Sequence, residues 1–172
     1  MTSGDWQLTT AVRAGGTYLP ANGVRAVSLP VRKGQAQRLG FGTAGGRGDL
    51  HVVRTVTVAA GAGATLDLYD GSLLDVFGQP APFRTLRAVA VWVDGGGDAA
   101  GVDVGADGVV ATPAPLFLKG TTPRATVYPG GPAYSAGSPA GLPVSAGAKN
   151  LLIHNPGAAA VTVIVALAGA SA

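Results

Sequence analysis

The sequence predicts an all-β protein: an antiparallel β-sandwich of jelly-roll type, built from about nine or ten short strands with little or no helix. Three observations predict this class. Apolar and polar residues alternate in several runs, as they do along half-buried strands. The 28 Gly and 12 Pro residues separate these runs with turn signals. Glutamate is absent, which removes one of the strong helix formers.

The composition indicates one packed domain that covers residues 1–172. A chain of 172 residues buries enough surface to need no covalent staples, and 47% of its residues are hydrophobic. It contains no cysteine, so disulfides, thiolate metal sites and cysteine nucleophiles are excluded. The N-terminus lacks a basic stretch followed by an apolar one, and no apolar run approaches membrane-spanning length. We therefore expect synthesis in the cytoplasm without export, and no membrane partner.

Positive charge is concentrated in the N-terminal third of the chain. Residues 1–54 carry seven basic and two acidic residues, although the whole chain has a net charge of only +3. One interpretation is ordinary solvated strands and loops. The sharper interpretation is a basic N-terminal segment, about residues 1–20, that acts as an attachment arm and docks on an acidic partner together with nearby arginines. We assign Arg13, Arg25 and Arg32 to this contact. Nucleic acid is not expected, because the arginines are dispersed and no binding motif is present.

The N-terminal half predicts three strands. The first covers residues 6–13 and ends at a Gly pair, and the second covers residues 24–31, where Pro30 favours an edge position. Residues 34–49 are interpreted as a loop. A clear alternating strand follows at residues 50–58.

The longest alternating run, residues 83–94, predicts the central strand of the protein. It places Val89, Val91 and Val93 on one face and Trp92 on the other, with Leu86, so Trp92 is expected to be mostly buried. A short strand at residues 65–69 precedes it. Between the two, the apolar residues of loop 71–82 predict a lid over one open end of the core.

The C-terminal half predicts several short strands and a final hairpin. Strands are expected at residues 101–104, 109–111, 116–119 and 125–128, followed by an ordered connection at 129–147. Residues 150–154 and 160–167 are interpreted as a hairpin. Its last strand is apolar on both faces and is therefore predicted to be central or to contact a second subunit. We assign this contact to Val161, Val163 and Val165.

No residue is assigned to catalysis, to a cofactor or to a metal, and an enzyme is not expected. The two histidines, His51 and His154, are far apart in the sequence and have no recognisable nucleophile or orienting acid. The aspartates between Asp94 and Asp107 match no calcium-loop spacing and are interpreted as turn residues. The Arg-Gly-Asp tripeptide at residues 47–49 is interpreted as a chance match.

Residues 64–169 resemble small virion proteins of tailed bacteriophages. The resemblance rests on the order of four features: LDLYDGSLLDVFGQPAPF before a long strand, VDVGADG, VYPGGPAYSAGSPAGLP, and the terminal NLLIHNPGAAAVTVIVALAG. It implies a β-sandwich subunit of the virion, of the head decoration or cement type, whose partners are the major capsid protein or other virion subunits. A homo-oligomer is also implied, and a trimer is preferred because capsid lattices offer threefold sites.

The alternative function is a β-sandwich that binds a host surface or a glycan as part of a phage tail, a fibre or a bacterial surface. Glycan-binding faces usually present exposed aromatic rings. The chain has only two Trp and four Tyr, so the structural function is favoured.

Overall fold

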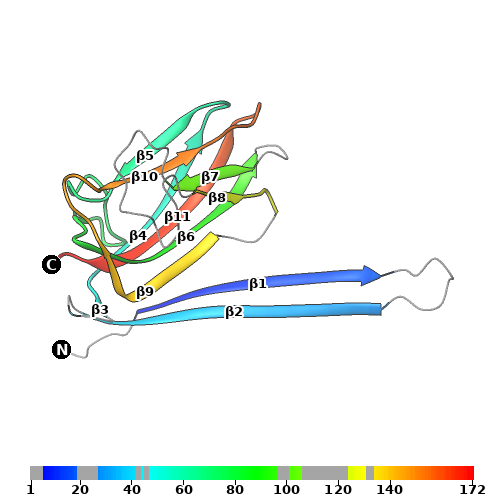
Figure 1. Cartoon of the computed structure of the whole chain (residues 1–172), viewed down its shortest axis with the longest axis horizontal. Coiled ribbons are helices and arrows are strands. Elements are labelled where there is room, and N and C mark those ends of the chain that lie inside the picture. Colours follow the sequence, from blue (N-terminus) through cyan, green and yellow to red (C-terminus); the bar gives the residue numbers. More distant parts are fainter. Residues whose placement is uncertain are drawn as a thin grey trace.

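A computed structural model describes residues 6–18, 27–41, 44, 47–96, 101–105, 124–130 and 134–172. Every regular element within these ranges is a β-strand, so the predicted all-β class is confirmed (Figure 1). The strands form a two-layered sandwich and a separate N-terminal ribbon.

The sandwich consists of two four-stranded antiparallel sheets. The larger sheet has the order β4 (Leu50–Val58), β11 (Val161–Ala170), β6 (Thr85–Gly96) and β9 (Tyr134–Pro143). The smaller sheet has the order β5 (Gly63–Asp67), β10 (Asn150–His154), β7 (Val102–Gly105) and β8 (Arg124–Val127). Of the predicted strands, residues 109–111 and 116–119 lie outside the described residues.

Consecutive strands repeatedly change sheets. The chain crosses from the larger to the smaller sheet between β4 and β5, between β6 and β7 and between β9 and β10. It returns between β5 and β6, between β8 and β9 and between β10 and β11. The predicted C-terminal hairpin is therefore wrong, because β10 and β11 pair with other strands and face each other across the core. Each strand has an apolar side that is buried in the core. If the two strands formed a hairpin within one sheet, the opposite sheet would lack the apolar side chains that one of them supplies to the core.

Asn155 links two connections between the sheets at one end of the sandwich, the one from β4 to β5 and the one from β10 to β11. Its side chain is 1% exposed, and Nδ2 donates to three carbonyl oxygens, those of Val58, Ala59 and Ala159. Its Oδ1 accepts from the backbone N–H of Gly157 at 3.0 Å. The buried amide thus satisfies the backbone groups that both turns leave without strand partners.

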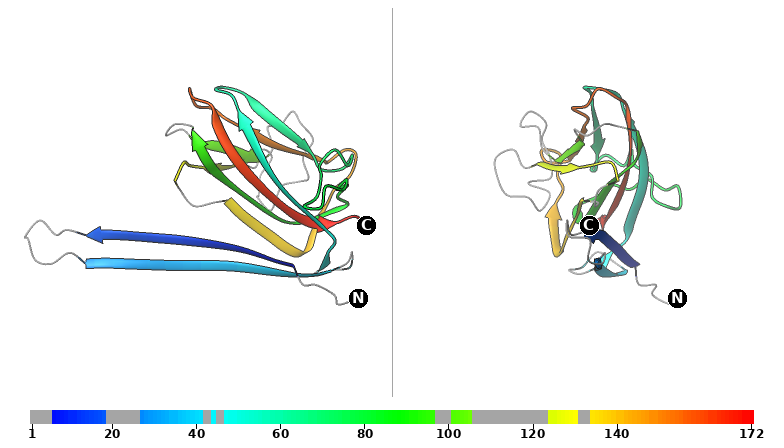
Figure 2. Two further views of the ribbon diagram at one scale, coloured as in Figure 1. Left: turned by 180° about the vertical axis from the view of Figure 1, so that it is seen from behind. Right: turned by 90° about the vertical axis from the view of Figure 1, so that its right-hand side faces the viewer.

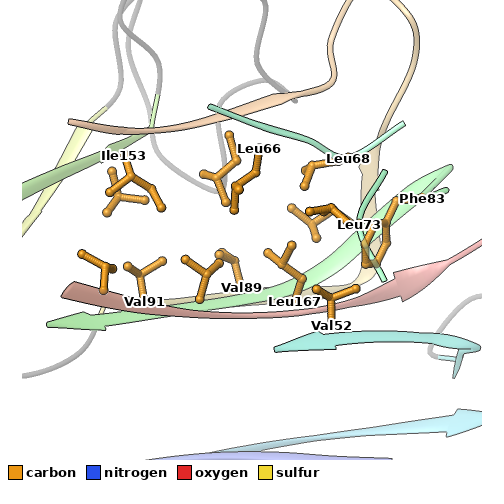
Figure 3. Packing of buried hydrophobic residues seen from close by; sticks show 14 of the residues in the cluster. Val52, Leu66, Leu68, Leu73, Phe83, Val89, Val91, Ile153 and Leu167 are labelled. Atoms are coloured by element: carbon orange, nitrogen blue, oxygen red, sulfur yellow. The ribbon is translucent and has the colours of Figure 1, made fainter. Parts of the chain in front are cut away.

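The core lies between the sheets and is aliphatic except for Phe83 (Figure 3). Alternate residues of the central strands supply it, among them Val89, Val91, Val163 and Leu167. A register irregularity near Arg87 interrupts the expected alternation of β6, so Leu86 joins the core side although it was predicted on the face of Trp92. Figure 3 shows the labelled side chains of both sheets pointing toward one another.

Trp92 lies outside this core. It pairs with Ile164 of β11, on the face of the sheet opposite to Val91 and Val163. Its burial is intermediate, so the prediction that Trp92 is mostly buried is confirmed, although the burial is not in the core between the sheets. The shift at Arg87 places Leu86 on the opposite side of the sheet from Trp92, whereas uninterrupted alternation assigns the two residues to one side.

Residues 134–143 form a strand, β9, and not the connection predicted from their Gly and Pro content. The strand pairs with β6 at the edge of the larger sheet, where missing N–H groups of proline are tolerated. Gly141, with φ +74°, approaches Thr85 so closely that an added Cβ would lie 2.3 Å from its Cγ2. Only glycine fits there without a shift of the backbone.

The N-terminal ribbon consists of β1 (Trp6–Tyr18) and β2 (Val27–Phe41), with the two-residue strand β3 (Arg47–Gly48) beside the end of β2. We call β1 and β2 together the arm. The predicted strands at residues 6–13 and 24–31 are longer than expected, and the predicted loop at 34–49 is strand up to Phe41. Pairing along the whole of β1 extends β2 through a stretch whose glycines favour a loop.

Candidate interaction surfaces

The arm leaves the sandwich near β3 and projects away from it. Figures 1 and 2 show both strands running below the sandwich and continuing past its opposite end. Strand β1 has 13 residues, which at about 3.3 Å per residue gives a reach of roughly 40 Å. A two-stranded ribbon alone is at best marginally stable in water. The arm therefore has the form of an element that is completed by a partner.

The arginines assigned to the attachment contact fall on this arm. The register places Arg13 directly opposite Arg32, while Arg25 lies outside the described residues. Residues 6–41 contain no Asp or Glu, so the arm carries a net positive charge. A net positive charge favours a negatively charged partner.

Val161, Val163 and Val165 occupy a different place from the one predicted. All three are 0–1% exposed and belong to the core of a single chain. They therefore cannot form the contact with a second subunit that we assigned to them unless the sandwich opens. The other side of β11 is also largely covered within the chain, because Ala166 and Ala168 are 4% and 6% exposed and Thr162 and Ile164 are partly buried.

Loop 71–82 presents an exposed apolar surface that the sequence analysis interpreted as a lid. Leu73 is buried and does close the end of the core, but Leu74 is 54%, Val76 47% and Phe77 72% exposed. We call these three residues the 74–77 patch. Exposed apolar side chains that lie close together in the sequence are a candidate interaction surface. The sequence feature that could have predicted this exposure is the Asp75–Gly78 turn, which directs the three side chains toward solvent.

Hydrogen bonds hold this turn in one conformation. The Oδ1 atom of Asp75 accepts from the backbone N–H groups of Phe77 and Gln79, each at 2.8 Å. Gly78 has φ +78° and donates to the carbonyl of Asp75. The turn is tied to the larger sheet by Val76, whose N–H donates to the carbonyl oxygen of His51 at 3.0 Å. The patch is therefore preorganised, which lowers the entropy cost of binding.

Charges of both signs lie in the segment that precedes β6. Partial burial acts to raise the pKa of Asp67, but the Lys149 ammonium and the N–H groups of Tyr69 and Asp70 outweigh it and lower the pKa. Asp70 and Asp75 have no salt bridge to a described residue, but Lys149 also attracts Asp70. The Arg84 guanidinium lies 4.0 Å from the ring centroid of Tyr69 and adds positive charge to the same region.

The outer side of the smaller sheet carries a polar row. The register aligns His154 with Asp103 and Asp103 with Thr126, whose Oγ1 donates to Asp103 Oδ1 at 2.8 Å. Tyr128 is 51% exposed beside it, and its ring lies against Gly101. Such groups can hydrogen-bond and stack on a polar ligand. Among the described residues no cluster of three or more possible metal ligands occurs.

The other candidate motifs are used structurally. The Asp49 carboxylate of the Arg-Gly-Asp sequence accepts hydrogen bonds from the N–H and hydroxyl of Ser171, and Gly48 is buried. His51 and His154 belong to different sheets. In the described part of the chain there is no helix long and apolar enough to cross a membrane.

Comparisons with known proteins give no match: no protein-family model, curated protein or solved structure is significantly similar to this chain.

Proposed function

We propose that this chain is a head decoration protein of a tailed bacteriophage, which binds capsid subunits and stabilises the particle. The observation that carries the proposal is the arm. A basic ribbon without a carboxylate that projects past its own sandwich is suited to joining subunits.

The order of the sandwich strands supports the same proposal. We interpret the sandwich as a jelly roll, because β4 pairs with β11, β5 with β10, β6 with β9 and β7 with β8 in two stacked four-stranded sheets. Jelly rolls are common in viral particles. The residues that resemble phage virion proteins, 64–169, cover most of these strands.

A decoration protein stabilises a particle through many modest contacts. Each subunit bridges neighbours in the lattice, so weak contacts add through multivalency. Contacts made by a basic arm with an acidic surface gain speed and orientation from electrostatic attraction and are weakened by salt.

The test is rebinding to heads of the encoding phage from which the protein has been stripped. Purified protein should sediment with these heads at low salt and increase their resistance to heat. Arg13→Glu together with Arg32→Glu should reduce binding, whereas Asp94→Lys, an exposed site on the sandwich, should not. Wild-type protein that fails to bind heads under any of these conditions contradicts the proposal.

A second candidate function is favoured by the polar row on the smaller sheet. A carboxylate, a hydroxyl, an imidazole and an exposed tyrosine ring on a flat sheet can recognise a sugar. Binding of the purified protein to host cells, lost on Tyr128→Ala and without binding to heads, would favour this function in place of decoration.

A further inference from the structure

We propose that strand β4 of one copy pairs with β4 of a second copy, antiparallel and across a two-fold axis at Thr55. The pairing joins the larger sheets of two sandwiches into one continuous sheet. Such a dimer goes beyond the proposed function and is independent of capsid binding. The observation that carries it is the free edge of β4, which differs from the other edges of the sandwich.

The other edge strands have features that protect an edge from pairing. Strand β9 carries Pro139 and Pro143, which lack an N–H, and its register with β6 is irregular. Strands β5 and β8 have only five and four residues. Prolines, bulges and very short strands are the usual means by which proteins avoid edge-to-edge association. These three edges are therefore poor templates for another strand.

Strand β4 has none of these features. It is nine residues long, contains no proline and pairs with β11 without a register shift. Valine and threonine make up most of it, and both favour extended strands. Its only charged residue is Arg54. A long, regular edge strand of this composition is a template for pairing with another chain.

The backbone groups of β4 point toward β11 and away from it at alternate residues. In β11, the carbonyl oxygen of Gly169 accepts from the N–H of Asp49, so the odd-numbered residues of β11 direct their backbone groups toward β4. Their register partners are the even-numbered residues of β4. His51 points the other way, and its carbonyl oxygen accepts from the N–H of Val76 at the free edge.

Beyond His51, the same alternation directs the N–H and C=O groups of Val53, Thr55 and Thr57 toward the free edge. None of these groups has a backbone partner among the described residues. The three side chains are exposed, with Val53 at 51%, so solvent reaches this part of the edge. A further strand could therefore pair with residues 53–57.

A second copy of β4 complements this edge. When Thr55 faces Thr55 of the second copy, Val53 faces Thr57, so that each outward N–H meets a carbonyl and about six hydrogen bonds form. Directly opposed threonines also hydrogen-bond through their hydroxyl groups. The two-fold axis makes both halves of the contact identical and uses the open edge of each copy, so the assembly stops at a dimer.

Charge selects this register and this partner. A register centred on Arg54 places two arginines directly opposite each other, which is destabilising, whereas the register centred on Thr55 places Arg54 opposite Val56. The arm is a poorer occupant of the edge, because residues 6–41 carry several basic residues and no carboxylate. Its positive charge would be repelled by Arg54 more strongly than a second β4, which carries one.

The experiment measures the dimerisation of full-length protein by sedimentation velocity and by light scattering over a range of concentrations. The paired segment is shorter than a standard interface requires, so we expect a dissociation constant of roughly 1–100 μM for the wild type. The variant Thr55→Lys places two ammonium groups opposite each other and should raise this constant roughly 10-fold or more.

The matched control is Thr65→Lys, at an exposed threonine of the edge strand β5, and it should dimerise as the wild type does. Both threonine side chains are exposed, so circular dichroism and melting temperature should stay close to those of the wild type for both variants.

Opposite charges at residue 55 test the register directly. Thr55→Asp should be as defective alone as Thr55→Lys, because the residue faces its own copy. An equimolar mixture of the two variants should form a one-to-one heterodimer, in which the introduced ammonium faces the introduced carboxylate. A contact that does not place residue 55 against itself gives no such complementation.

The proposal is overturned if the wild type is monomeric at all concentrations tested, if Thr55→Lys dimerises as the wild type does, or if the mixture forms no heterodimer. Fibres in place of dimers would also overturn the two-fold pairing. Wild-type monomers that bind phage heads, with binding lost in Thr55→Lys, would assign the edge to another virion subunit and leave the decoration function standing. Dimers that show complementation but ignore heads would support the pairing and contradict the decoration function.

Discussion

Single small residues determine how closely neighbouring strands of the larger sheet approach each other and the residues just before β6. Gly169 in β11 is the tightest described case, because an added Cβ would lie 2.1 Å from the carbonyl oxygen of Thr85 and 2.7 Å from the ring of Phe83. Contacts below 3.0 Å require atoms to move, and here one of them is backbone. The position is therefore closed to any side chain.

We predict that Gly169→Ala destabilises the fold by roughly 1–3 kcal/mol, the usual cost of overpacking a core. Urea unfolding followed by circular dichroism measures the change. Gly95→Ala is the matched control: nothing lies within 4 Å of its added Cβ, so its free energy of unfolding should stay close to the wild-type value. Equal effects of the two substitutions would contradict the packing described here.

We predict that Asn155→Ala costs roughly 3 kcal/mol. The substitution leaves three carbonyl groups and one N–H at the joined turns without their side-chain partner, and buried unsatisfied groups of this kind cost about 1–3 kcal/mol each when water cannot reach them. We expect a total near the lower end of the summed costs, because two of the hydrogen bonds lie in partly buried surroundings. Thermal unfolding against an Asn150→Ala control measures the loss.

His51 makes stability depend on pH in the range just below neutrality. Burial lowers the pKa of His51 from its ordinary value of 6.5, because the charged imidazolium is poorly solvated there. The unfolded chain therefore takes up a proton at a higher pH than the folded one, and stability falls as the pH drops below about 6.5. Urea unfolding at pH 7.5 and 5.5 should show this decrease, and His51→Gln should reduce it. An unchanged pH dependence in the variant would rule out His51 as its source.

At the scale of the elements, β11 has two sides with different functions. Its inward valines fill the core between the sheets, and its outward side carries the buried Ala166 and Ala168 and the partly buried Thr162 and Ile164. A sequence pattern that is apolar on both sides is typical of a central strand as well as of an interface strand, so the pattern alone left the two alternatives open.

We predict that Val163→Asp prevents folding, because it places an unpaired charge at a position that is 0% exposed. A loss of roughly 3–5 kcal/mol or more is expected, which is a large part of the stability of an ordinary domain. Thr162→Asp, one residue away on the outward side, should fold normally. A folded but monomeric Val163→Asp protein would show that this valine contacts another subunit after all.

At the scale of the whole molecule, stability is divided unequally between the sandwich and the arm. The sandwich has a continuous core, whereas the arm pairs chiefly with itself. We predict that trypsin cuts the isolated protein at Arg13, Arg32 and Arg38 long before it digests the sandwich. Mass spectrometry of the early fragments tests this. Protection of the arm on assembled particles is expected, while equal rates of cleavage in the arm and at Arg54 in the sandwich would contradict the division.

The sequence by itself determined the class of fold and the main strands. Alternation identified β4 with its observed bounds and identified β6 and β10 within two residues, because a strand with one buried side must repeat with period two. It also located the basic excess that the arm carries. Arg13 and Arg32 lie on a separate N-terminal element that is longer than the segment of about 20 residues that we expected, and Arg25 lies outside the described residues. The contact of these arginines with a partner stays a prediction.

Only the tertiary structure decided which side of each strand is buried, and which strands are partners. The alternation of β6 contains no sign of the shift near Arg87, and a shift of one residue exchanges the two faces. The sequence between β10 and β11 is compatible with a hairpin, yet the strands belong to different layers. The exposure of Phe77 likewise depends on a turn fixed by Asp75, not on hydrophobicity. These features depend on contacts between residues far apart in the chain, which local patterns do not encode.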